Sequence, residues 1–87
     1  MKILGNQVLA ARGLLRWSQR QLAVAADVTE DTIAAWERGE REPRRETIEK
    51  IVSAFSSRGI EFLNGGQPGV RFKAKPGAEV EQEAAGE

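Results

Sequence analysis

The sequence predicts a mainly α-helical fold, in which four short helices form a bundle and a β-hairpin follows them. Three observations support this prediction. Apolar residues recur every three or four positions up to residue 55, residues that favour helix ends stand at the expected boundaries, and the hydrophobic period changes to two after Gly59. A chain of 87 residues has room for one domain of this kind.

The first two predicted helices span residues 6–16 and 19–26. The apolar residues that share one face of the first helix are Val8, Ala11 and Leu15. Ser18 is a favourable N-cap for the second helix, and Gln21, three residues later, completes a capping-box pattern. The two helices are therefore expected to be separate.

The third and fourth predicted helices are delimited by capping residues and a proline. Thr29 is the expected N-cap of the third helix, which ends at Gly39. Pro43 prevents continuation and lets a fourth helix start at Arg44 and stop before Gly59. The inward residues expected from these two helices are Ile33, Trp36, Ile48, Ile51, Val52 and Phe55.

Two alternating runs, residues 60–63 and 70–73, flank a loop rich in Gly, Pro and Asn and predict a β-hairpin. Its apolar face consists of Ile60, Phe62, Val70 and Phe72. An isolated two-stranded ribbon is marginal in water, so this face must pack on the helices or on a second subunit. Residues 59–73 are therefore the candidate dimerisation element, with a ribbon folded onto its own helices as the alternative.

The composition excludes several classes of protein. The chain contains neither Cys nor His. The lack of Cys excludes a disulfide scaffold, a thiol nucleophile and Cys-ligated zinc, and the lack of His removes the usual general base and the commonest metal ligand. We therefore expect no enzyme activity, no metal, no cofactor and no small-molecule substrate. Because no apolar run is long enough for a membrane span, we expect no membrane partner and a cytoplasmic location.

Basic and acidic residues balance at 13 each, but they are unevenly distributed. Residues 1–73 hold twelve basic and nine acidic residues, whereas residues 74–87 hold one basic and four acidic residues. Residues 74–87 also contain a single β-branched residue, Val80, and no aromatic residue, which predicts a disordered acidic tail. This tail is either a solvated terminus or a screen for the basic body.

The second and third helices together predict a helix-turn-helix geometry. The inward residues of this pair are Leu22, Ala26, Ile33 and Trp36, and Val28 fills the turn. The small side chain of Ala23 lets the two helix axes approach closely. The third helix then lies across the second with its outer face bare, a shape that fits the DNA major groove, which is about 12 Å wide.

Two motifs make this region similar to a known family. Residues 18–23 read Ser-Gln-x-x-Leu-Ala, and residues 33–39 read Ile-x-x-Trp-Glu-Arg-Gly, with Pro43 shortly after them. Over about residues 7–55 the chain resembles the phage-repressor helix-turn-helix family, often called the Cro/CI or XRE type.

The resemblance implies both a fold and a function. Residues 1–58 are expected to form a lambda-repressor-like helix-turn-helix bundle of four to five short helices, followed by the C-terminal β-hairpin. The implied function is that of a sequence-specific transcriptional regulator, a repressor, which binds double-stranded DNA. The resemblance further implies a homodimer on a pseudo-palindromic operator, with residues 29–38 in the major groove.

The resemblance also implies roles for individual residues. The base-reading positions are Thr29, Glu30, Asp31 and Thr32, with Ala35 one turn further along the same outer face. The other expected DNA contacts are Ser18, Gln19, Arg38, Arg41, Arg44 and Arg45. Gln19 contacts a phosphate or braces a neighbouring side chain, and the arginines contact phosphates; a solvated surface is the alternative for all of them. Arg12 and Glu37 correspond to an internal salt bridge between the first and third helices.

Two positions depart from the family pattern. Asp27 stands at the turn position that usually holds Gly, although Asp tolerates the left-handed conformation better than most residues. Glu30 and Asp31 place carboxylates at the reading end, which weakens the attraction to phosphates. These carboxylates still suit cytosine, whose N4 amino group donates a hydrogen bond in the major groove.

A second class of function remains open at this point. A protein-interaction module, such as an antitoxin or an adaptor, would use the third helix and the hairpin to bind a protein partner. The acidic pair and the balanced net charge favour this class, whereas the basic cluster at residues 38–45 favours DNA. A salt titration distinguishes the two, because phosphate contacts make DNA affinity steeply salt-dependent.

Overall fold

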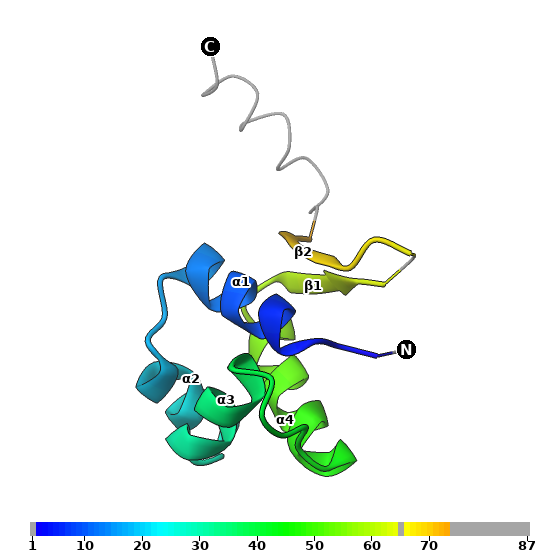
Figure 1. The fold of residues 1–87 in the computed structure, drawn as a ribbon. Helices are drawn as coiled ribbons and strands as arrows, with labels where there is room; N and C mark the ends of the chain where they lie inside the picture. Colours follow the sequence, from blue (N-terminus) through cyan, green and yellow to red (C-terminus); the bar gives the residue numbers. More distant parts are fainter. Residues whose placement is uncertain (1, 65, 74–87) are drawn as a thin grey trace.

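The computed structural model describes residues 2–64 and 66–73, which form four helices and one two-stranded antiparallel sheet (Figure 1). The elements in chain order are α1 (Gly5–Leu15), α2 (Gln19–Ala26), α3 (Glu30–Glu37), α4 (Arg45–Ser56), β1 (Ile60–Leu63) and β2 (Gly69–Phe72). The predicted mainly helical fold with a C-terminal hairpin is confirmed. The tail predicted for residues 74–87 lies outside the described residues.

The capping residues act as their sequence positions predicted. The Ser18 hydroxyl accepts a hydrogen bond from the Gln21 backbone N–H at 3.0 Å, and the Gln21 side chain accepts one from the Ser18 N–H at 2.8 Å. At the start of α3 the Thr29 hydroxyl accepts from the Thr32 N–H at 3.2 Å. Asp27 ends α2 with a φ of 59°, the left-handed conformation that the turn requires.

Several element boundaries differ slightly from the prediction. α1 spans Gly5–Leu15 rather than residues 6–16, and it ends where Arg16 adopts a left-handed conformation with a φ of 56°. α4 begins at Arg45, because Arg44 keeps an extended backbone as the N-cap, with a ψ of 159°. α3 ends at Glu37, before the predicted Gly39, and β2 spans Gly69–Phe72 rather than residues 70–73.

The core draws on all four helices and β1. Its largest fully buried side chains are Val8, Leu22, Ile33, Ile51, Phe55 and Ile60. The Phe55 ring centroid lies 5.7 Å from that of Trp17 and 5.7 Å from that of Phe62, so one α4 side chain joins the α1–α2 connection to the hairpin. α2 also packs against both α3 and α4, which fixes the helix-turn-helix pair to the rest of the molecule.

The hairpin packs across α1 and α4, at the end of the molecule away from α2 and α3 (Figure 1). Gln7 of α1 is buried beneath it, and its amide nitrogen donates to the carbonyls of Leu63 at 3.1 Å and Gly69 at 3.0 Å. The Gln7 side-chain oxygen accepts from the Leu4 N–H at 2.8 Å. A single polar side chain therefore anchors both strands to α1.

The apolar face of the hairpin is largely covered by its own chain. Strand register pairs Ile60 with Phe72 and Phe62 with Val70, so the four side chains share one face. Ile60 is 1% exposed, and Phe62 and Val70 pack against the core. The ribbon therefore folds onto its own helices, which was the alternative left open by the sequence, and the protein's own chain covers Ile60. Phe72 remains 50% exposed.

Candidate nucleic-acid interface

α2 and α3 are held as a pair by side chains that reach the core. The buried residues of the pair are Leu22, Ala23, Ala26, Ile33 and Trp36. In the turn, the Val28 N–H donates to the Ala23 carbonyl at 3.0 Å, and the Val28 side chain packs against the core. These contacts fix the angle between the two helices, so α3 presents a defined face to solvent.

The first turn of α3 projects from this pair. Thr29, Glu30 and Asp31 are exposed, and Thr32 is half-buried. The hydroxyl oxygens of Thr29 and Thr32 lie 2.8 Å apart, within hydrogen-bond distance. The residues predicted to read bases therefore lie together on one accessible helical turn.

Ala35 does not lie on the outer face of α3, so its predicted placement there is wrong. It is 5% exposed, and its carbonyl accepts from the N–H groups of Glu40 at 2.9 Å and Arg41 at 3.4 Å. The chain after Gly39 thus folds back over this side of the helix. Ala34, which is half-buried and four residues after Glu30, takes the more outward position.

Arg12 and Glu37 form the expected ion pair at the C-terminal end of α3. Their side chains are 15% and 6% exposed, and Arg12 donates to the two carboxylate oxygens at 2.7 and 2.8 Å. Arg12 also donates to the Trp17 carbonyl at 2.8 Å, and the Gln19 amide donates to Glu37 at 3.0 Å. The hydrogen bond with Glu37 raises the pKa of Arg12, so the guanidinium stays charged. The start of α2 is thereby linked to both α1 and α3.

Two of the arginines predicted to contact phosphates are near carboxylates. Arg38 donates to the two oxygens of Glu40 at 2.8 and 2.9 Å, and this hydrogen bonding holds the pKa of the Glu40 carboxyl below its usual range. Arg45 Nε lies 3.8 Å from Glu49 Oε2. Glu40 therefore occupies the Nε and Nη2 side of the Arg38 guanidinium, through which a phosphate would otherwise bind with two hydrogen bonds.

Arg41 and Arg44 form no ion pair within residues 2–64 and 66–73. With Thr32 and Glu42 they line a surface pocket of about 320 Å³ between α3 and the start of α4. The Glu42 carboxylate lies 3.1 Å from the Lys2 ammonium, which partly neutralises it. Two guanidinium groups beside a helix N-terminus suit an anionic ligand such as a phosphate.

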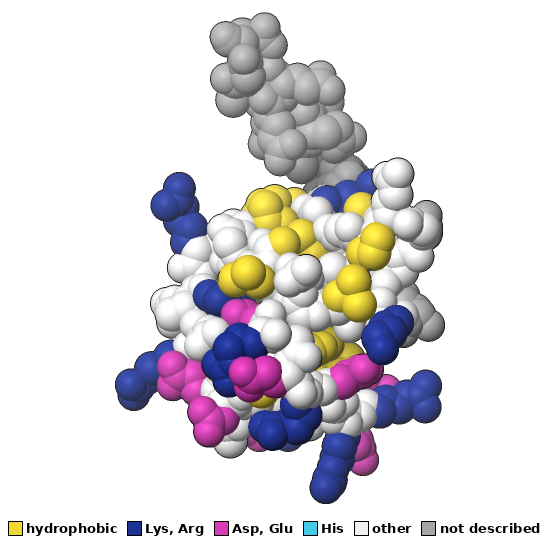
Figure 2. Space-filling view, viewed as in Figure 1, with side chains coloured by type: hydrophobic (Ala, Val, Ile, Leu, Met, Phe, Trp, Pro, Cys, Tyr) yellow, Lys and Arg dark blue, Asp and Glu magenta, His cyan; other side chains and the backbone are white. Residues whose placement is uncertain are grey.

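The surface is divided by side-chain type (Figure 2). Lys, Arg, Asp and Glu side chains mix over the lower part of the view, which holds α2, α3 and the start of α4. Hydrophobic side chains gather over α1 and the hairpin, where the exposed large residues are Leu9, Leu14 and Phe72. Attraction to a polyanion must therefore come from particular arginines rather than from a uniformly basic face.

A comparison with protein families agrees with this geometry. A family model described as helix-turn-helix matches residues 8–62, which is more than half of the chain. The chain belongs to the helix-turn-helix family of the Cro/CI, or XRE, type. This family consists of DNA-binding transcriptional regulators. No curated protein matches the sequence.

The helix-turn-helix match begins in α1 and ends in β1, so it includes the Arg12–Glu37 pair but not β2. Three features of this helix-turn-helix protein were not predicted: the contact of Gln7 with the hairpin, the pairing of Arg38 with Glu40, and an apolar groove beside α4. Among these, the Arg38–Glu40 pair had a local signal, since the two residues are close in sequence.

The described residues contain no group of three or more Asp, Glu, His or Cys side chains that could hold a metal ion. In the same part of the chain, no helix is long and apolar enough to cross a membrane.

Proposed function

We propose that this protein is a sequence-specific transcriptional repressor in the cytoplasm that binds a pseudo-palindromic operator as a homodimer. Residues 29–38 enter the major groove of double-stranded DNA. The observation that carries this proposal is the exposed first turn of α3, whose angle is held by the buried α2–α3 contacts and by Glu37. A protein bound to an operator keeps other proteins from binding the same DNA, which supports repression.

Phosphates on either side of the groove are held by different elements. Arg41 and Arg44 bind one strand beside the N-terminus of α4, where their guanidinium groups line the pocket next to Thr32. Ser18 and Gln19 face the other strand from the start of α2, and Gln19 is positioned by its bond to Glu37. Such contacts fix the register of a protein on DNA without reading its sequence.

Glu30 and Asp31 supply the base readout. An ionised carboxylate accepts hydrogen bonds, and the N4 amino group of cytosine is a donor in the major groove that suits it. Thr29 and Thr32 add hydroxyl groups that both donate and accept. The acidic pair lowers affinity for any phosphate backbone, so specificity depends on bases that satisfy these carboxylates.

A salt titration of DNA affinity tests this function. The affinity of the full chain for a random-sequence duplex is measured by fluorescence anisotropy between about 50 and 200 mM salt, and we expect a steep fall. Arg41→Gln and Arg44→Gln should each weaken binding and reduce the salt slope by about 1. Arg71→Gln, which removes the same charge from the hairpin, should leave the slope unchanged. Binding that is absent or independent of salt contradicts the proposal.

A protein-binding module is the second candidate function. The exposed apolar residues Leu9, Leu14 and Phe72 favour it, because they lie on α1 and β2, away from the first turn of α3. Apolar surface that is exposed in one chain can be removed from water when another protein covers it. In the salt titration this candidate predicts no measurable DNA affinity at physiological salt.

A further inference from the structure

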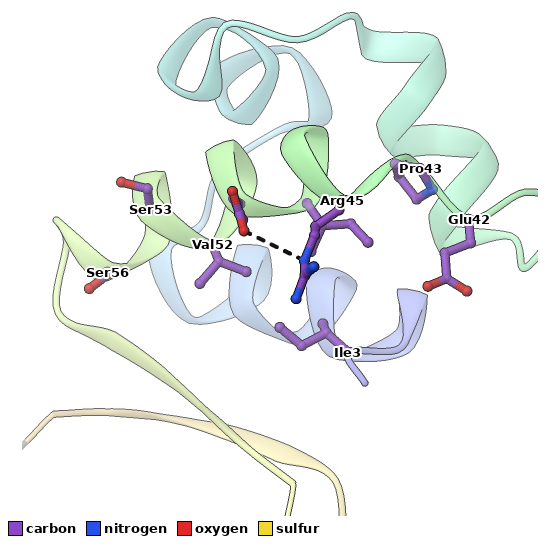
Figure 3. A pocket seen from close by; sticks show the side chains of 9 residues that line it. Ile3, Glu42, Pro43, Arg45, Val52, Ser53 and Ser56 are labelled. Carbon is purple, nitrogen blue, oxygen red and sulfur yellow. Dashed lines mark ion pairs between the residues drawn. The ribbon is translucent and has the colours of Figure 1, made fainter. Parts of the chain in front are cut away.

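A groove runs along α4, between this helix and the N-terminal segment (Figure 3). Its apolar lining comes from Ile3, Pro43, Ile48 and Val52, and its volume is about 610 Å³. We refer to it as the α4 groove. Ile48 and Val52 are half-buried, so part of each apolar side chain remains open to a partner.

Arg45 and Glu49 also line the α4 groove, with opposite charges one helical turn apart, and the dashed line in Figure 3 marks their ion pair. Their side chains are 90% and 70% exposed, and the 3.8 Å between Nε and Oε2 is too long for a hydrogen bond. Such an exposed pair contributes little within one chain. Both charges are therefore available to a partner that places an acidic side chain opposite Arg45 and a basic side chain opposite Glu49.

A second copy of this chain provides both side chains. When two α4 helices pack antiparallel about a two-fold axis, Arg45 of each copy faces Glu49 of the other. The apolar side chains of Ile48 and Val52 then lie against the same two residues of the other copy, between the two Arg45–Glu49 pairs. An isologous contact requires this kind of self-complementarity, and an apolar centre with a polar rim is the usual anatomy of an interface.

The position of the α4 groove also suits a dimer on DNA. Pro43 lines the groove, and its neighbour Arg44 lines the proposed phosphate pocket, so the two surfaces are continuous. Binding to two half-sites requires both α3 helices to face the same side of the duplex, where successive half-sites lie about 34 Å apart. The hairpin lies at the opposite end of the molecule from the starts of α3 and α4 (Figure 1). Pairing through the hairpin would therefore turn the two α3 helices away from each other.

We infer that a second copy of this chain docks in the α4 groove, with Arg45 and Glu49 paired between the copies. This inference rests on the proposed function, because it names the surface through which the DNA-binding dimer assembles. A helix of 12 residues is only about 18 Å long, so the contact area is small and the free dimer is weak. Two adjacent half-sites raise the effective concentration of the second copy and stabilise the dimer on DNA.

Sedimentation equilibrium of the full chain without DNA tests the inference. We expect a monomer–dimer equilibrium with a Kd on the order of 10 μM. Val52→Glu and Arg45→Glu should each raise this Kd by about tenfold or more, and the double variant Arg45→Glu/Glu49→Arg should restore it. Phe72→Glu, on the hairpin, should leave it unchanged. The Arg45 and Glu49 variants alter exposed residues, so they test the interface even if Val52→Glu fails to fold.

Three results would overturn the inference: a monomer at every concentration up to about 1 mM, no effect of the Arg45 charge reversal, or loss of the dimer in Phe72→Glu. DNA binding is measured separately, with duplexes that carry one or two half-sites recovered by selection. A folded Val52→Glu variant should bind a duplex with one half-site as tightly as the wild type does. It should lose the higher affinity for a duplex with two half-sites. If the variants weaken the dimer but no DNA is bound, the docking surface stands and the proposed function fails.

Discussion

Arg12 of α1 and Glu37 of α3 form a bidentate ion pair that is largely buried. The same carboxylate accepts from Gln19, and the same guanidinium donates to the Trp17 carbonyl. One pair therefore joins the first three helices at the point that sets the direction of α3. A charge left unpaired at such a buried site is costly.

Removal of Arg12 should destabilise the protein strongly. Arg12→Met leaves Glu37 buried and unpaired, and we expect a loss of about 3–5 kcal/mol in the free energy of unfolding. The double variant Arg12→Met/Glu37→Met should lose less than the sum of the two single variants, because neither charge is left alone. Urea unfolding followed by tryptophan fluorescence measures all three. Strict additivity would show that the two side chains do not interact.

Two glycines of α1 should respond in opposite ways to alanine. A Cβ at Gly5 would lie 1.9 Å from the Trp36 carbonyl oxygen, so Gly5→Ala forces α1 away from α3 and should cost about 1–3 kcal/mol. Gly13 has open space around its Cβ position, and Gly13→Ala should stabilise the protein by about 0.5–1 kcal/mol. Thermal unfolding of both variants checks this contrast. Equal effects would mean that α1 and α3 are not in close contact.

Glu40 should act as an internal competitor of DNA for Arg38. Glu40→Gln frees the guanidinium, and we expect a two- to fivefold gain, roughly, in affinity for a random-sequence duplex. Glu61→Gln is the matched control, because it removes the same charge and frees Arg71 on the hairpin. An equal gain in both variants would indicate a net-charge effect rather than competition at Arg38.

The effect of Glu40 on DNA affinity should stay constant between about pH 6 and pH 8. Pairing with Arg38 lowers the pKa of Glu40 from its ordinary value of 4.5. A lowered pKa means that the pairing is fully present above that value and is lost as the pH falls through the shifted pKa. The affinity gain of Glu40→Gln should therefore be the same at pH 8 and pH 6, roughly, within the range where the carboxyl stays ionised. A gain that disappears at the lower pH contradicts the pairing.

Glu30 should govern base preference more than affinity. Glu30→Ala removes an acceptor from the exposed first turn of α3 and also removes a negative charge that repels phosphates. We expect the preference among base sequences to relax, while affinity for random-sequence duplexes stays the same or rises. A gel-shift series over duplexes that differ at single positions measures both. An unchanged ranking of the duplexes would exclude Glu30 from the readout.

The features that the sequence predicted are those with local causes. Ser18 and Thr29 cap helices through bonds to residues three positions away, and Gly39 and Asp27 adopt the left-handed backbone that ends a helix. Helical spacing likewise placed Ile33 in the core. Each of these depends on a few neighbouring residues, so a single sequence contains the needed information.

The features that the sequence did not predict depend on distant parts of the chain. Gln7 binds carbonyls of the hairpin more than fifty residues away, which no local pattern indicates. Ala35 was placed on the outer face by the family resemblance, yet it is 5% exposed, and its carbonyl accepts hydrogen bonds from the N–H groups of Glu40 and Arg41. The sequence left open whether Ile60 packs on the helices or on a second subunit, because its cover, the protein's own helices, depends on tertiary packing.

Sequence-specific binding is tested most directly by selection of bound duplexes from a random pool, with the full chain and with Glu30→Ala. We expect enrichment of a two-fold-symmetric site, with half-site centres about 10 base pairs apart, and a loss of preference in Glu30→Ala at one position of each half-site. Recovered sequences that match the starting pool would contradict sequence-specific binding.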